Sequence, residues 1–232
     1  MENSRMVLVF WVLIGLFSCE NINHHKIDLS TDKYLSNIFS PTEIESFALM
    51  IDFVDSAVVA ITNNKNEAEA YHDFFEIYGK GIRENKRISP FSEKEKFDFL
   101  ESLDKGAFDA IWIFDTHIDR LNYRDTILTN IDYIKCLSIN PFGRYIDYME
   151  QVGNNDKRYT ELHEHIVGMG DLSTCAGLWM VHDEFDFGKV EDRFLAAVYI
   201  LRVEDSYETK LDRYFSKIDS THNTQYNQWR AQ

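Results

Sequence analysis

Acidic and histidine side chains gather in residues 161–165, which read Glu-Leu-His-Glu-His. In a helix, Glu161 and His165 stand four residues apart and share a face, so they could hold a divalent cation. The two histidines lie only two residues apart and face different directions, unlike the His-Glu-x-x-His pair of zinc proteases. A polar helix face with stabilising side-chain contacts explains the same residues, and we favour that interpretation.

A second pair, Glu69 and His72, has the Glu-x-x-His spacing that supplies metal ligands in helical di-iron proteins. Such a site requires another pair of this kind and two further glutamates on facing helices. The sequence offers no second pair, and a chain with 39 acidic residues produces this spacing by chance. We therefore interpret Glu69 and His72 as a solvated pair on a helix surface, and we predict no metal or other cofactor.

A third grouping, His182-Asp183-Glu184 with Asp186, lies near Trp179. Carboxylates beside aromatic side chains are typical of clefts that cleave sugars, where two acids stand about 5–10 Å apart. Neighbouring acids in one turn do not face each other across a cleft, and helix capping explains them equally well. The sequence also lacks a Gly-x-Ser-x-Gly motif, a glycine-rich phosphate loop and a dinucleotide-binding motif. No catalytic residue is predicted.

The N-terminus carries the most specific signal. Residues 6–17 are apolar except for Gly15. They are too few to cross a membrane, which takes about 20 residues, but they match the apolar region of a signal peptide, about 7–15 residues. Leu16-Phe17-Ser18-Cys19 resembles the lipobox of bacterial lipoproteins. The resemblance implies cleavage before Cys19, acylation of Cys19 and anchoring in the cell envelope, at the outer membrane where the organism has one.

Two alternatives to lipidation are an ordinary cleaved signal peptide and a buried N-terminal helix. With lipidation as the leading prediction, the chain divides into four parts. These are a signal peptide over 1–18, a lipidated N-terminus and flexible tether over 19–39, a single helical domain over 40–218 and a polar tail over 219–232. The tether is expected because residues 20–33 are polar and contain few large apolar side chains.

Composition sets limits on the fold and on the partners. Hydrophobic residues make up 44% of the 232 residues, enough to bury a sizeable core. The formal net charge is −15. It argues against nucleic acid as a ligand, because phosphate binding needs clustered lysine and arginine, and against anionic lipid headgroups beyond the anchor. An acidic surface would attract a basic protein or cations, although it is also typical of a soluble protein without such a partner.

The body is predicted to be helical. Three prolines and ten glycines mostly separate segments whose apolar residues recur at spacings of three and four. Ser40-Pro41-Thr42-Glu43 and Ser92-Glu93-Lys94-Glu95 are capping boxes that mark helix starts, whereas Gly79 and Gly81 are expected to end a helix. Together the segments predict an all-α fold, an irregular multi-helix bundle. Helices are expected over 41–62, 67–78, 93–103, 108–121, 123–137, 141–153, 157–167, 172–182, 190–203 and 206–218.

Three details remain to be tested. The aromatic and β-branched content of residues 108–114 would also suit a short buried strand, although we favour a helix. Residues 194–201 are apolar nearly all round and should form the central buried helix. Cys136 and Cys175 could form a disulfide in an oxidising compartment, or each could be a small buried apolar side chain.

These observations favour a membrane-tethered, non-catalytic, acidic binding protein of the bacterial cell envelope. One concrete version is an immunity or inhibitor lipoprotein that captures a basic toxin or lytic enzyme. The alternative is an envelope hydrolase, with or without a bound cation, that uses some of Glu161, His165, His182 and Asp183. The two hypotheses differ in whether those four side chains meet in one pocket.

Overall fold

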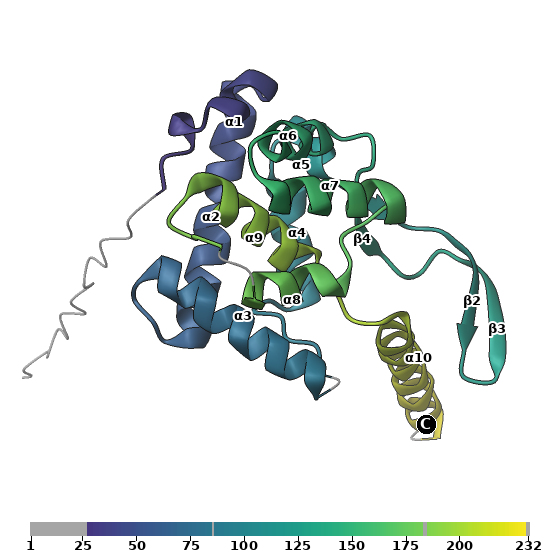
Figure 1. Cartoon of the computed structure of the whole chain (residues 1–232). Coiled ribbons are helices and arrows are strands. Elements are labelled where there is room, and N and C mark those ends of the chain that lie inside the picture. Colours follow the sequence, from purple (N-terminus) through teal and green to yellow (C-terminus); the bar gives the residue numbers. More distant parts are fainter. Residues whose placement is uncertain (1–26, 85, 183–184, 231–232) are drawn as a thin grey trace, which may run out of the picture.

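The computed structural model describes residues 27–230 apart from residues 85, 183 and 184 (Figure 1). The predicted mostly helical fold is confirmed, but the all-α class is wrong in detail, because the described residues also form two small antiparallel sheets. In chain order the elements are η1 (Leu29–Thr31), α1 (Lys33–Ile38), α2 (Pro41–Thr62), α3 (Glu67–Arg83), α4 (Glu93–Ser102), α5 (Lys105–Ile111), β1 (Trp112–Asp115), β2 (Ile118–Tyr123), β3 (Thr126–Ile131), β4 (Cys136–Ile139), α6 (Arg144–Gly153), α7 (Lys157–Met169), α8 (Thr174–His182), α9 (Val190–Arg202) and α10 (Tyr207–Arg230).

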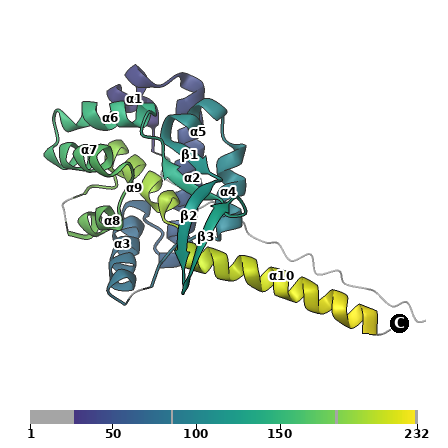
Figure 2. The same cartoon turned by 90° about the vertical axis from the view of Figure 1, so that its right-hand side faces the viewer.

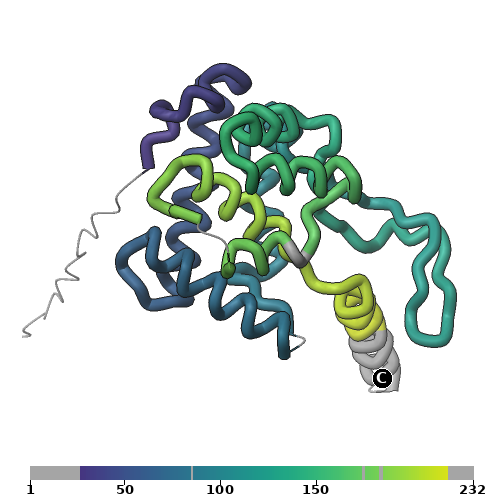
Figure 3. The backbone as a smooth tube through the Cα atoms, viewed as in Figure 1, coloured from purple at the N-terminus to yellow at the C-terminus, as the bar shows by residue number. Residues whose placement is uncertain are grey.

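Helix α9 forms the centre of the body, with the other helices of the main core around it (Figures 1 and 3). Its side chains from Phe194 to Leu201 are all at most 2% exposed, which confirms the predicted central helix. The ring of Phe194 lies 5.1 Å from that of Phe47 in α2 and 5.6 Å from that of Tyr145 in α6. Because no face of this segment is polar, burial on all sides is the arrangement that removes its apolar surface from water.

The predicted helix starts are confirmed at two positions. At α2, the side chain of Glu43 accepts a hydrogen bond from the backbone nitrogen of Ser40 at 2.8 Å, and the Ser40 hydroxyl accepts one from the backbone nitrogen of Glu43. At α4, the Ser92 hydroxyl accepts a bond from the backbone nitrogen of Glu95 at 3.2 Å. Each contact satisfies a backbone group that has no partner within the helix.

The predicted end of the second helix is wrong, because Gly79 and Gly81 lie inside α3, which continues to Arg83. A Cβ atom on Gly79 would lie 3.2 Å from the side chain of Val181, and one on Gly81 would lie 2.5 Å from that of Ile88. These glycines therefore allow neighbouring segments to approach α3 closely, which is a different use of glycine from ending a helix.

The helices expected between residues 108 and 137 are a second correction. Helix α5 stops at Ile111, and β1 continues from Trp112 and pairs with β4 in antiparallel register. Strands β2 and β3 form a hairpin whose turn places Arg124 at φ 51°. The isoleucines in this region are spaced as on the inward face of a helix, which led to the wrong prediction. In the structure Ile127 is 50% exposed on the hairpin. The threonine and isoleucine residues of β3 favour a strand.

The flexible tether expected over 19–39 does not extend to residue 39. Leu29 and Leu35 are buried in the main core, with 3% and 0% exposure. The polar residues that suggested a tether are helix caps: Asp28 accepts a hydrogen bond from the backbone nitrogen of Ser30, and Asp32 accepts bonds at the start of α1. The predicted signal peptide and Cys19 lie outside the described residues.

Helix α10 continues to Arg230, past the predicted end at residue 218, and leaves the body beside the β2–β3 hairpin (Figure 2). A second small core, formed by Ile131, Ile134 and Leu211, joins the hairpin to the first turns of the helix. No helix among the described residues is long and apolar enough to cross a membrane.

Candidate functional site

The structure gives the predicted helical pair on α7 separate partners. The carboxylate of Glu161 lies 2.8 Å from the Lys157 ammonium, one turn earlier on the same helix. His165 Nε2 shares a hydrogen bond of 2.8 Å with the Ser173 hydroxyl, and its ring packs against Trp179. Glu161 and His165 therefore do not act together on a common ligand in this structure.

The other predicted groupings are similarly divided. Glu69 accepts a hydrogen bond of 3.5 Å from Asn64, whereas His72 packs against the ring of Phe187. His182 is exposed at the end of α8, and Asp183 and Glu184 lie outside the described residues. Asp186 accepts a bond from the backbone nitrogen of Gly188, as in a turn. Within the described part of the chain, no three histidine, cysteine or acidic side chains are arranged to hold a metal ion.

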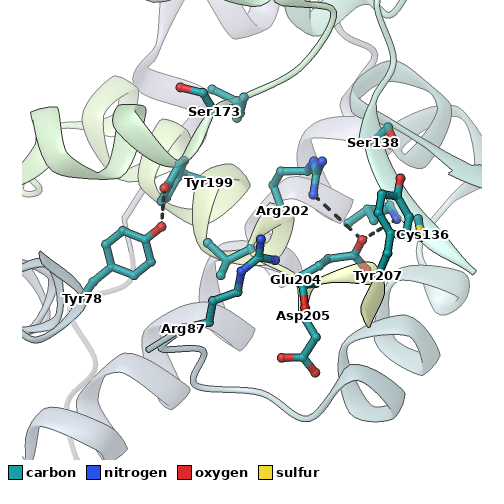
Figure 4. Close-up of a pocket in the computed structure, with 14 residues that line it drawn as sticks. Tyr78, Arg87, Cys136, Ser138, Ser173, Tyr199, Arg202, Glu204, Asp205 and Tyr207 are labelled. Carbon is teal, nitrogen blue, oxygen red and sulfur yellow. Dashed lines mark hydrogen bonds and ion pairs between the residues drawn. The ribbon is translucent and has the colours of Figure 1, made fainter. Parts of the chain in front are cut away.

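A polar pocket of about 170 Å³ lies elsewhere, between the segment after α3, strand β4 and the connection from α9 to α10 (Figure 4). None of Glu161, His165 and His182 lines it. Its polar lining residues are Tyr78, Arg87, Ser138, Ser173, Tyr199, Arg202, Glu204, Asp205, Ser206 and Tyr207. The pocket is the best candidate site because charged side chains, tyrosine and serine hydroxyls face one space.

Both carboxylates that line the pocket already have partners. Glu204, which is 9% exposed, accepts hydrogen bonds from the backbone nitrogen of Leu137 at 2.9 Å and from the Lys210 ammonium at 3.1 Å. Asp205 accepts a bond of 2.7 Å from Arg213. These contacts tie β4 to the start of α10 and leave little negative charge available to a ligand.

Two buried lysines stand behind Glu204. Lys96 lies 3.7 Å from the Glu204 carboxylate and donates a hydrogen bond to the carbonyl oxygen of Val203. Burial lowers the pKa of Lys96 to about 8, because a low-dielectric environment penalises the charged ammonium. Burial acts in the same direction on Lys210, but Glu204 and Glu93 outweigh it and raise the pKa of that lysine. Both lysines therefore carry charge near neutral pH, and perturbed groups beside a pocket mark a candidate site.

Arg202 is fixed in place at the pocket wall. Its Nε atom lies 2.9 Å from each carboxylate oxygen of Asp171, and its NH2 group pairs with the same carboxylate. Tyr78 and Tyr199 share a hydrogen bond of 2.8 Å between their hydroxyl groups. Tyr199 fits here because a Cβ atom at Gly177 of α8 would lie only 2.4 Å from its hydroxyl oxygen.

Cys136 lines the same pocket as a free, buried thiol, so the disulfide that the sequence left open is not formed. Burial raises the pKa of the Cys136 thiol above its usual value, although Lys210 opposes this effect. A thiol with a raised pKa is a weak nucleophile at neutral pH. Cys136 therefore serves the packing of β4.

A second buried ion cluster ties α2, α3 and α9 together. The Arg193 guanidinium donates two hydrogen bonds to Asp55, at 3.0 and 2.8 Å, and lies 3.3 Å from Glu67. Tyr71 donates a further bond of 2.9 Å to Asp55. Burial raises the pKa of Asp55 above its usual value even though Arg193 and Tyr71 oppose this effect. All four side chains are enclosed by the core, so the cluster is a structural one.

The sequence analysis did not identify these charged residues, but it contained a signal for some of them. Asp55 lies between Ile51 and Val58 at helical spacing, and Arg193 immediately precedes the apolar segment 194–201. A charge at an inward position of an apolar helix requires a buried partner. Comparison of the chain with known protein families, curated proteins and solved structures gives no match. Function is therefore argued from the residues of this chain.

The α6–α7 hairpin carries exposed acidic residues on both of its helices. Asp147, Glu150 and Glu164 are exposed there and make no ion pair with a described residue. The two arginines of the hairpin have other partners. Arg144 pairs with Glu43, whose side chain is 7% exposed, and Arg158 pairs with Asp192, whose side chain is 2% exposed. The two arginines thus neutralise buried carboxylates and do not pair with Asp147, Glu150 or Glu164.

Proposed function

We propose that this protein is a membrane-tethered, non-catalytic binding protein of the bacterial cell envelope, which captures a basic protein partner. The observation that carries the proposal is the distribution of charge on the folded body. Interior carboxylates such as Glu43, Asp55 and Glu204 are paired with cations, so most of the net charge of −15 is carried by exposed side chains. A surface of this kind steers basic proteins toward it.

The tether is the second part of the proposal. Its support is the resemblance of Leu16-Phe17-Ser18-Cys19 to a lipobox, together with the apolar run over residues 6–17. A single lipid-modified cysteine holds the acidic body near a membrane, where a toxin or a lytic enzyme with a basic surface would arrive. An immunity or inhibitor role is the specific version that joins the anchor to the acidic surface.

Capture of the partner is expected to depend on salt and on the α6–α7 face. The lipidated protein should retain a basic protein from an envelope extract at about 50 mM NaCl and release it at about 500 mM, because salt screens exposed charges. Changing Asp147, Glu150 and Glu164 together to lysine should abolish retention at low salt. Quantitative pull-down followed by mass spectrometry measures both effects.

The control variant has Asp73, Glu76 and Glu95 of α3 and α4 changed to lysine. Its net charge changes by the same amount as in the α6–α7 variant, and it should retain the partner. All six side chains are exposed, so circular dichroism should show the same helical content for both variants. Retention that persists at high salt, or that is unchanged by reversal of the α6–α7 charges, would contradict the proposal.

A further inference from the structure

The pocket lining does not share the acidic balance of the whole protein, because its charged residues are two arginines and two carboxylates. Its two carboxylates are matched by cations, since Glu204 pairs with Lys210 and Asp205 pairs with Arg213. Arg87 also lines the pocket and makes no ion pair with any residue that the structure describes. An acidic protein therefore presents an unmatched guanidinium group at its polar pocket.

We propose that this pocket binds a small oxyanion, a carboxylate or phosphate group, with Arg87 as its main ligand. The guanidinium group donates hydrogen bonds in a planar fork that matches two oxygen atoms of such a group. Figure 4 shows Arg87 and Arg202 lining the pocket from different segments, with the guanidinium group of Arg202 directed toward Glu204. This site lies apart from the α6–α7 face and does not depend on the proposed capture of a protein partner.

The position of Arg87 is not explained by stabilisation of a helix. Lys80 and Arg83 lie in the last turn of α3, where positive charge interacts favourably with the helix dipole. Arg87 lies four residues beyond the end of that helix, where this effect has faded. Its guanidinium group instead faces a pocket wall that contains a second, rigidly held arginine.

The surroundings of Arg87 supply hydroxyl groups, because the neighbouring cations are already paired. Arg202 pairs with Asp171, and Lys210 pairs with Glu204 and Glu93. The hydroxyl groups of Ser173 and Tyr207 line the same space and can donate or accept hydrogen bonds. A cation would meet only carboxylates that are already neutralised, so the site favours an anion.

The size of the pocket limits the ligand. A volume of about 170 Å³ is below the roughly 300–1,000 Å³ of pockets that enclose drug-sized molecules. The pocket therefore suits an anionic group rather than a complete cofactor. Carboxylate and phosphate groups both offer oxygen atoms that accept hydrogen bonds from arginine. They differ in shape, so binding of one and not the other would identify the preferred group.

Isothermal titration calorimetry of the lipidated protein with sodium phosphate and with sodium acetate tests the proposal, with sodium chloride at equal ionic strength as the reference. We expect saturable binding of phosphate, of acetate or of both, and the pattern identifies the shape that the site prefers. Changing Arg87 to glutamine should weaken binding roughly 10–100-fold, as expected for loss of a charged hydrogen-bond donor.

Arg83→Gln is the matched control, because Arg83 is an exposed arginine on the same stretch of chain that does not line the pocket. It should bind the anion as the wild type does. Absence of saturable binding of both anions would overturn the proposal, as would equal affinity in Arg87→Gln and the wild type. Circular dichroism of the two variants shows that the fold is the same in each.

Discussion

Replacing Arg193 by methionine is expected to lower the free energy of unfolding by about 3–5 kcal/mol, the usual effect of removing one partner from a buried ion cluster. The substitution keeps much of the apolar volume but removes the cation that faces Asp55 and Glu67. Both carboxylates are at most 6% exposed, and they would remain in the core without the Arg193 guanidinium that faces them. Tyr71 donates one hydrogen bond to Asp55 and cannot replace a charge.

Urea denaturation monitored by circular dichroism measures the loss. Arg120→Met is the control, because Arg120 is exposed on β2 and makes no ion pair with a described residue, so its replacement should change stability by less than about 0.5 kcal/mol. Adding Asp55→Asn to Arg193→Met should restore part of the lost stability, since it removes the buried carboxylate that accepts two hydrogen bonds from Arg193. Equal unfolding midpoints for Arg193→Met and Arg120→Met would show that the cluster contributes nothing.

The second large effect is expected at Leu201, near the end of α9. This side chain is 0% exposed, and its replacement by alanine removes buried contacts and leaves a cavity. The expected cost is about 2–5 kcal/mol. That is a large part of the roughly 5–15 kcal/mol that stabilises a typical domain. Chemical denaturation again provides the measurement.

Leu49→Ala is the control for this prediction, because Leu49 is 58% exposed on α2. Leu29, which lies in the segment expected to be a tether, is not a neutral position. It is 3% exposed, so its truncation should also destabilise the fold. If Leu201→Ala and Leu49→Ala unfold at the same denaturant concentration, α9 is not the packed centre of the protein.

Much of the helical framework could be predicted from local sequence. The serine-based caps before α2 and α4 and the apolar segment at 194–201 are local signals, and the structure contains all three. The strands could not be predicted in the same way, because the pairing of β1 with β4 joins segments that are more than twenty residues apart. Strands β2 and β3 form a local hairpin, but the apolar spacing of β3 fits a helix equally well until its pairing with β2 is known.

The pocket could not be predicted either, because it is formed by segments that lie far apart in the sequence. It combines Arg87 from the segment after α3 with Arg202 and Glu204 from the end of α9 and the turn that follows. No short motif connects these positions, and each one alone resembles an ordinary surface charge. The candidates that local motifs did suggest, such as Glu161 with His165, proved to have separate partners.

The central claim, that this acidic body is held at a membrane by lipid on Cys19, is tested most directly by metabolic labelling. Cells producing the full chain are grown with a fatty-acid analogue, and the protein is examined for label and for size. The wild type should be labelled and shortened by 18 residues, and Cys136→Ala, which alters the free thiol of β4, should behave identically. Cys19→Ala should give an unlabelled, unprocessed chain. Equal labelling of Cys19→Ala and the wild type would contradict the account.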